Sequence, residues 1–162
     1  MEITLREFRR HDFNTLWRID QECFATGVAY SRQELSDYIQ RRGSFTLVAE
    51  ATPGATAQYS TEDPAPTGII GFLVAEAGRR GTGHIITIDV LPIARRSGIG
   101  SQMLSTAEEK LRASTCFAVQ LETAVDNAGA LAFYQRHGYQ NVGTIPQYYG
   151  NGQDAFSLAK QL

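Results

Sequence analysis

The chain lacks the features that mark a disulfide-stabilised, membrane-spanning or nucleic-acid-binding protein. Its 162 residues include only two cysteines, Cys23 and Cys116, which are far apart in sequence and form neither a disulfide framework nor a zinc site. No apolar run approaches the roughly 20 residues that a membrane span needs. The net charge is -2, so electrostatics gives no reason to expect binding to nucleic acid or to an anionic membrane.

The composition is that of an ordinary globular domain. Hydrophobic residues make up 43% and charged residues 20% of the chain, and the length predicts one domain over residues 1–162. The first residues lack the basic and apolar segments of a signal peptide, so we expect a cytoplasmic protein. No group of side chains has the spacing of metal ligands, and we expect no metal.

Hydrophobic periodicity predicts an α/β fold with a mixed sheet of about seven strands flanked by four helices. Asp12 is expected to cap the first helix, and Ser31 with Glu34 forms a capping box for the second. Residues 52–67 are rich in Pro, Thr, Ala and Gly and indicate a long loop. Helices are expected at about 12–24, 31–42, 98–113 and 127–136, and strands at about 3–8, 45–51, 68–77, 84–91, 117–124, 139–145 and 155–162.

The most specific pattern is Arg95-Arg96-Ser97-Gly98-Ile99-Gly100, where a strand passes into a helix. The first turn of a helix has unpaired N–H groups and the positive end of the helix dipole, and glycine lets an anion approach the backbone closely. Such a segment suits a pyrophosphate. The chain has neither GxxxxGK[ST] nor GxGxxG after its first strand, which disfavours Walker and Rossmann nucleotide sites.

This segment resembles the [RQ]-x-x-G-x-[GA] motif of GNAT acetyltransferases, and the expected order of strands and helices is also that of the GNAT fold. The resemblance implies an N-acetyltransferase that uses acetyl-CoA as its cosubstrate. It assigns the CoA pyrophosphate to Arg95, Arg96, Ser97, Gly98, Ile99, Gly100 and Ser101. It assigns the pantetheine amide groups to the backbone of Ile88, Asp89 and Val90.

Three further segments resemble protein N-terminal acetyltransferases, including the ribosomal-protein-alanine type. They are residues 121–139 with Asn127 and Tyr134, residues 148–155 with two tyrosines, and residues 27–31, which lack the usual proline. The resemblance implies that Asn127 and Tyr134 contact acetyl-CoA. The substrate would then be the α-amine of a protein or peptide, bound near Tyr30, Tyr148 and Tyr149.

Three side chains are candidates for proton transfer. Glu122, expected in an interior strand, is either the partner of an arginine or a general base that deprotonates the incoming ammonium. His84 is either a surface residue or a second base. Tyr134 either fills the core or donates a proton to the CoA thiolate. Two other functions stay open, namely acetylation of a small amine (an amino acid, polyamine or antibiotic) and non-catalytic binding of acyl-CoA.

Overall fold

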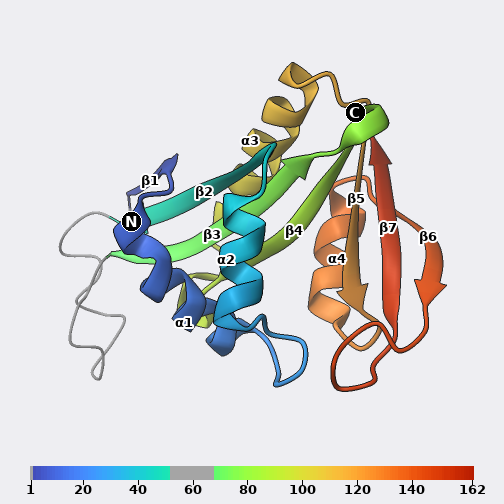
Figure 1. Ribbon diagram of the computed structural model, residues 1–162, viewed down its shortest axis with the longest axis horizontal. Coiled ribbons are helices and arrows are strands. Elements are labelled where there is room, and N and C mark those ends of the chain that lie inside the picture. The colour runs from blue at the N-terminus through green and yellow to red at the C-terminus, as the bar shows by residue number, and fades with distance from the viewer. Residues whose placement is uncertain (1, 52–67) are drawn as a thin grey trace.

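The hydrophobic strands assemble into one seven-stranded sheet in the order β1-β2-β3-β4-β5-β7-β6 (Figure 1). The computed structural model describes residues 2–51 and 68–162, so the long loop expected at 52–67 lies outside the described residues. Within that part of the chain there are four α-helices, as the sequence predicts. The helices are α1 (Phe13–Cys23), α2 (Arg32–Gln40), α3 (Ile99–Ala113) and α4 (Ala128–Arg136). The strands are β1 (Ile3–Glu7), β2 (Ser44–Ala51), β3 (Ile69–Ala77), β4 (Thr82–Val90), β5 (Ala118–Ala124), β6 (Gln140–Ile145) and β7 (Ala155–Gln161).

The sheet separates between β4 and β5, the one parallel pair of neighbours among the described strands. These strands pair only from Thr82, opposite Ala118, to His84, opposite Gln120. Beyond His84 they diverge, which is visible as the widening space between the two ribbons in Figure 1. The backbone edges that face this fork are therefore not hydrogen-bonded to each other.

A β-bulge lies beside the fork. Thr87 pairs with Val74 on β3 and Ile85 pairs with Ala75, so Ile86 is an extra residue with no opposite partner. A bulge bends the strand and turns the neighbouring groups to a new direction, and bulges are frequent beside active sites.

Helices cover both faces of the sheet and enclose two hydrophobic clusters. On one face α1 and α2 bury Leu16, Ile19 and Leu35 against β2 and β3. On the other face α3 and α4 pack against β2, β3, β4, β5 and β7, with Met103 and Leu104 fully buried. This packing holds the two arms of the fork in place.

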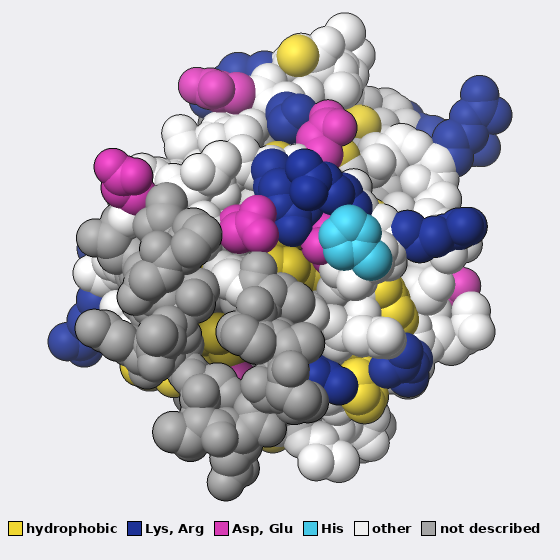
Figure 2. Space-filling view, turned by 90° about the vertical axis from the view of Figure 1, so that its left-hand side faces the viewer, with side chains coloured by type: hydrophobic (Ala, Val, Ile, Leu, Met, Phe, Trp, Pro, Cys, Tyr) yellow, Lys and Arg dark blue, Asp and Glu magenta, His cyan; other side chains and the backbone are white. Residues whose placement is uncertain are grey.

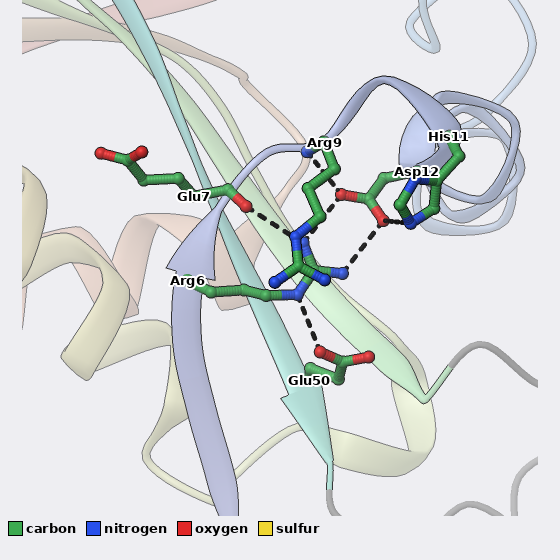
Figure 3. Close-up of polar contacts among 6 residues, drawn as sticks. All are labelled: Arg6, Glu7, Arg9, His11, Asp12 and Glu50. Carbon is green, nitrogen blue, oxygen red and sulfur yellow. Dashed lines mark hydrogen bonds and ion pairs between the residues drawn. The ribbon is translucent and has the colours of Figure 1, made fainter.

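The capping box predicted for the second helix is confirmed, because Ser31 accepts a hydrogen bond from the Glu34 N–H and Glu34 accepts one from the Ser31 N–H. The side-chain cap predicted at Asp12 is wrong, although α1 does begin directly after that residue. Both Asp12 oxygens instead bind the Arg6 guanidinium, at 2.8 and 3.0 Å (Figure 3). Two hydrogen bonds from one guanidinium, with its full positive charge, bind a carboxylate more strongly than a single N–H of a helix terminus does.

Arg6 is the centre of an ion-pair cluster near the edge of the sheet. Its Nε donates to Glu50 at 2.7 Å, while Asp12 is only 2% exposed (Figure 3). Figure 2 views the molecule from this side and shows basic, acidic and histidine side chains gathered together. The cluster joins β1, β2 and the turn before α1. None of the helices in the described ranges is long and apolar enough to cross a membrane.

Candidate active site

The fork between β4 and β5 opens into a cavity of about 900 Å³. Its lining includes most of the residues that the sequence singled out, although they come from distant parts of the chain. They are Tyr30, Ile88, Val90, Arg95, Arg96, Gly98, Ile99, Gly100, Ser101, Glu122, Asn127, Tyr134, Tyr148 and Tyr149. His84, Asp89 and Ser97 are not among the lining residues.

At one end of the cavity, the loop after β4 leads into α3. Gly98 precedes the first helical residue and has φ of +86°, a backbone conformation that L-residues rarely adopt. A Cβ at Gly98 would meet no described atom within 4 Å, so the space above this helix start is open. The N-terminus of α3 thus presents its unpaired N–H groups to the cavity beside an open space that suits a phosphate group.

The polar side chains of this loop differ in where they point. The Arg95 Nε donates to the Val90 carbonyl at 3.0 Å, so this guanidinium folds back over the end of β4. The Ser97 hydroxyl donates to the Ala94 carbonyl and braces the loop. The Ser101 Oγ lies 2.9 Å from His137 Nε2 of α4. A phosphate-binding role of the Arg95–Ser101 segment therefore rests chiefly on its backbone and on Arg96.

The edge of β4 beyond His84 faces the cavity, and Ile88 and Val90 lie on it. A strand edge without a partner offers N–H and C=O groups to an extended ligand with amide groups. The side chain of Asp89 is fully buried, outside this lining, and bonds to Thr87. Only its backbone remains a candidate for the pantetheine contact.

His84 and Glu122 meet at the apex of the fork, where β4 and β5 begin to diverge. Their Nε2 and Oε2 atoms are 2.6 Å apart, and Glu122 lines the cavity. The Glu122 side chain is 14% exposed, so the carboxylate is shielded but reachable from the cavity. The two residues that the sequence offered as alternative bases form one hydrogen-bonded pair.

Glu76 of β3 extends this pair and has no sequence signal of its own. Its Oε1 lies 3.8 Å from His84 Nδ1 and 3.4 Å from the Nη1 of Arg41, which is half exposed. The polar side chains thus continue from the cavity through His84 toward the surface. Glu76 enters the cluster because it pairs with His84 across the β3–β4 ladder, a register that periodicity does not predict.

Tyr134, on α4, also lines the cavity and is 9% exposed. Burial, followed by the charge of Asp89, raises the pKa of its hydroxyl, which keeps the phenol protonated at neutral pH. Asn127 caps α4, because its Oδ1 accepts the Ala130 N–H at 3.1 Å. This cap fixes the helix that carries Tyr134.

At the other end of the cavity, two loops touch. The Gly150 N–H donates to the Gly27 carbonyl at 3.0 Å, which joins the loop between β6 and β7 to the loop between α1 and α2. A Cβ at Gly27 would lie 2.7 Å from the Asn151 Cβ, so this contact requires glycine. Tyr30 and Tyr149, which belong to these same two loops, line the cavity.

Cys23 also lines the cavity but is poorly suited to be a nucleophile. Burial raises the pKa of its thiol to about 12, so the reactive thiolate is scarce at neutral pH.

The sequence from residue 13 to residue 139 matches the acetyltransferase (GNAT) family. The chain belongs to this family. GNAT enzymes use acetyl-CoA, and the GNAT fold expected from the motifs is confirmed by solved structures.

Two curated relatives and one solved structure illustrate the similarity. The chain is 34% identical over 94 residues to an uncharacterized N-acetyltransferase of Methanocaldococcus jannaschii, covering 57% of this chain and 60% of that protein. It is 38% identical over 92 residues to the N-alpha-acetyltransferase MAK3 of Arabidopsis thaliana, covering 55% and 48%. The matches thus span about half the length of these relatives. A chain in the crystal structure of the NatC complex bound to Gag peptide and CoA superposes with a TM-score of 0.79 at 23% identity, over 100% of this chain and 99% of that one.

The same fold also serves other acceptors. A nourseothricin acetyltransferase superposes with a TM-score of 0.75 at 18% identity, over 99% of both chains. At such low identity these structural likenesses establish the fold alone.

Proposed function

We propose that the protein transfers the acetyl group of acetyl-CoA to the N-terminal α-amine of a protein or peptide. The main support for a peptide acceptor is the hydrogen bond between Gly27 and Gly150, which joins two loops at the acceptor end of the cavity. The relatives described as N-alpha-acetyltransferases support the same class.

The described residues fit acetyl-CoA. The open space at Gly98 suits the pyrophosphate, held by the first N–H groups of α3 and by Arg96. The free edge of β4 at Ile88 and Val90 suits the amide groups of the pantetheine arm. Acetyl-CoA supplies an activated thioester carbonyl, and the reaction needs an amine with a free electron pair.

Glu122 is placed to take the proton from the ammonium of the acceptor, directly or through water. An α-ammonium has a pKa near 8 and must lose a proton before its nitrogen can attack, and a carboxylate in contact with it can accept that proton as a general base. His84, at 2.6 Å, orients Glu122 and accepts the proton in turn, and Glu76 holds the other side of the imidazole. The proton then passes from the imidazole toward Glu76 and the surface.

The neutral amine then attacks the thioester carbonyl, the new C–N bond forms, and the C–S bond breaks. Backbone N–H groups on the free edge of β4 near the Ile86 bulge are placed to stabilise the oxyanion. Tyr134 supplies the proton that converts the departing thiolate into CoA-SH. Its raised pKa keeps the phenol protonated at neutral pH, so the proton is present when the C–S bond breaks. The proton that the nitrogen loses as the amide forms returns to Tyr134, so that no net proton is gained or lost in this step.

The two joined loops favour a peptide over a long flexible amine. A peptide backbone carries N–H and C=O groups next to its α-amine, and these find partners in the loop backbones and in the tyrosine hydroxyls. The Tyr30 hydroxyl donates to the Ile86 carbonyl at 3.2 Å and so offers only its acceptor capacity, which leaves Tyr148 and Tyr149 as the freer pair.

The test is a thiol-release assay with acetyl-CoA against a panel of N-terminal peptides, free amino acids and polyamines. The proposal expects peptides with a free α-amine to give the highest kcat/KM. Release with a free amino acid or a polyamine alone would replace it by acetylation of a small amine. Tight binding of acetyl-CoA without release on any amine would indicate a non-catalytic acyl-CoA-binding protein.

A further inference from the structure

Two carboxyl groups that the chemistry above does not use are buried against each other beside the cavity. Asp20 of α1 and Asp89 of β4 are both fully inaccessible to solvent, and each carboxyl group is among the groups that shift the pKa of the other. They are 69 positions apart in the sequence, and nothing in either segment indicates that they meet.

The hydrogen-bonding pattern of the pair leaves one oxygen of each aspartate without a donor, and one shared proton can satisfy both. Asp20 Oδ2 accepts the Tyr30 N–H at 2.7 Å, and Asp89 Oδ1 accepts the Thr87 hydroxyl. Among the described residues, no N–H or O–H group donates to Asp20 Oδ1 or to Asp89 Oδ2. A proton held on Asp89 and donated to Asp20 satisfies both oxygens at once.

The same contact fixes the residue at the acceptor end. Besides its N–H bond to Asp20, the Tyr30 carbonyl accepts hydrogen bonds from Trp17 Nε1 at 3.2 Å and from Gln21 Nε2 at 2.7 Å. The Tyr30 hydroxyl donates to the Ile86 carbonyl on β4. Tyr30 is thereby held between α1 and β4, and Asp20 is the acceptor of its backbone N–H.

We propose that Asp20 and Asp89 are a proton-sharing pair that positions Tyr30, and with it the loop between α1 and α2, for binding of the acceptor amine. They are positioning residues, since neither side chain lines the cavity. The inference rests on the proposed function in placing the acceptor beside Tyr30.

The proton held by the pair makes the stability of the folded protein depend on pH. Burial, and next the Asp20 charge, raises the pKa of Asp89 well above its ordinary value. The folded protein therefore retains a proton that the unfolded chain has lost, and folding stability falls as pH rises toward the pKa of the folded state. Other titratable or charged groups also act electrostatically on the pair. They are Cys23 of α1, Tyr30 of the following loop, Glu34 of α2, Arg95 of the loop after β4, and Tyr134 of α4.

Two variants of Asp20 separate proton sharing from simple packing. In Asp20→Asn the amide oxygen accepts the Tyr30 N–H, and the amide nitrogen donates to Asp89 without needing a shared proton. In Asp20→Ala both bonds are lost. We expect Asp20→Ala to raise the acceptor KM about tenfold, with the acetyl-CoA KM within about twofold of wild type, and Asp20→Asn to restore the acceptor KM to within about threefold.

Trp17 provides a readout that needs no acceptor, because it is the single tryptophan and donates to Tyr30. Its emission in the wild type should change reversibly as the pH is raised and the pair loses its proton, and in Asp20→Asn this change should be absent. If Asp20→Asn shows the same alkaline change, or if it is as impaired as Asp20→Ala at pH 7, the proposal is overturned. A peptide that is no substrate, with the Trp17 result as expected, would refute only the proposed acceptor.

Discussion

Replacing Glu122 by glutamine tests the proton path most sharply. The change keeps the size of the side chain and leaves it able to hydrogen-bond His84 at the apex of the fork, where the two groups now lie 2.6 Å apart. It removes only basicity. Loss of a general base lowers turnover by about 10²–10⁴-fold, which corresponds to roughly 2.7–5.5 kcal/mol in the activation free energy.

The assay is steady-state thiol release at saturating acetyl-CoA and acceptor, with the affinity for acetyl-CoA measured by calorimetry. We expect Glu122→Gln to lose kcat while the affinity changes less than about twofold, since the carboxylate lies at the apex and not in the phosphate loop. The matched control is Glu109→Gln on the exposed face of α3, which should keep full turnover. A Glu122→Gln enzyme with kcat within about threefold of wild type would refute the reasoning, and a large loss in His84→Gln alone would then assign the base to histidine.

Three further changes follow from the same geometry. Gly98→Val should weaken acetyl-CoA binding at least about tenfold in calorimetry. The control is Gly152→Val, because Gly152 has the same φ of +86° in equally open space, and this variant should keep its affinity for acetyl-CoA. Equal affinities of the two variants would remove the helix start from the cofactor site. Arg6→Ala leaves Asp12 buried without its cation and should lower the free energy of unfolding, measured with denaturant, by about 3 kcal/mol. Arg10→Ala on the surface should lower it by less than about 0.5 kcal/mol. Similar losses in the two variants would show that the ion-pair cluster is not stabilising. Tyr149→Ala should raise the KM for a peptide more than the KM for acetyl-CoA, and the reverse order would move Tyr149 out of the acceptor region.

Local patterns predicted the elements well because their causes are local. The capping box joins Ser31 and Glu34, which are three positions apart, and the glycine at position 98 meets a backbone need at that position itself. The order of strands and helices follows from periodicity of the same short range. The family motif carried the expectation of a GNAT fold, which the sequence match and the superpositions confirm.

Long-range pairings could not be predicted in this way. The hydrogen bond between His84 and Glu122 joins residues 38 positions apart, and it depends on where β4 and β5 stop pairing. Asp12 shows the same limit on a smaller scale: its position suits a helix cap, but the guanidinium of Arg6 competes successfully for its carboxylate. The roles given to the site residues stay predictions.

The central claim, acetyl transfer from acetyl-CoA to a terminal α-amine, is tested most directly with one peptide that carries both a free N-terminus and a lysine. After incubation with the protein and acetyl-CoA, fragmentation mass spectrometry locates the acetyl group. A lysine side chain would leave polar groups of the two loops unpaired, and each unpaired buried polar group costs about 1–3 kcal/mol. The α-amine should therefore be acetylated at least about fivefold faster than the lysine ε-amine. Acetylation of the lysine in preference to the N-terminus, or of neither amine while a polyamine is consumed, would contradict the account.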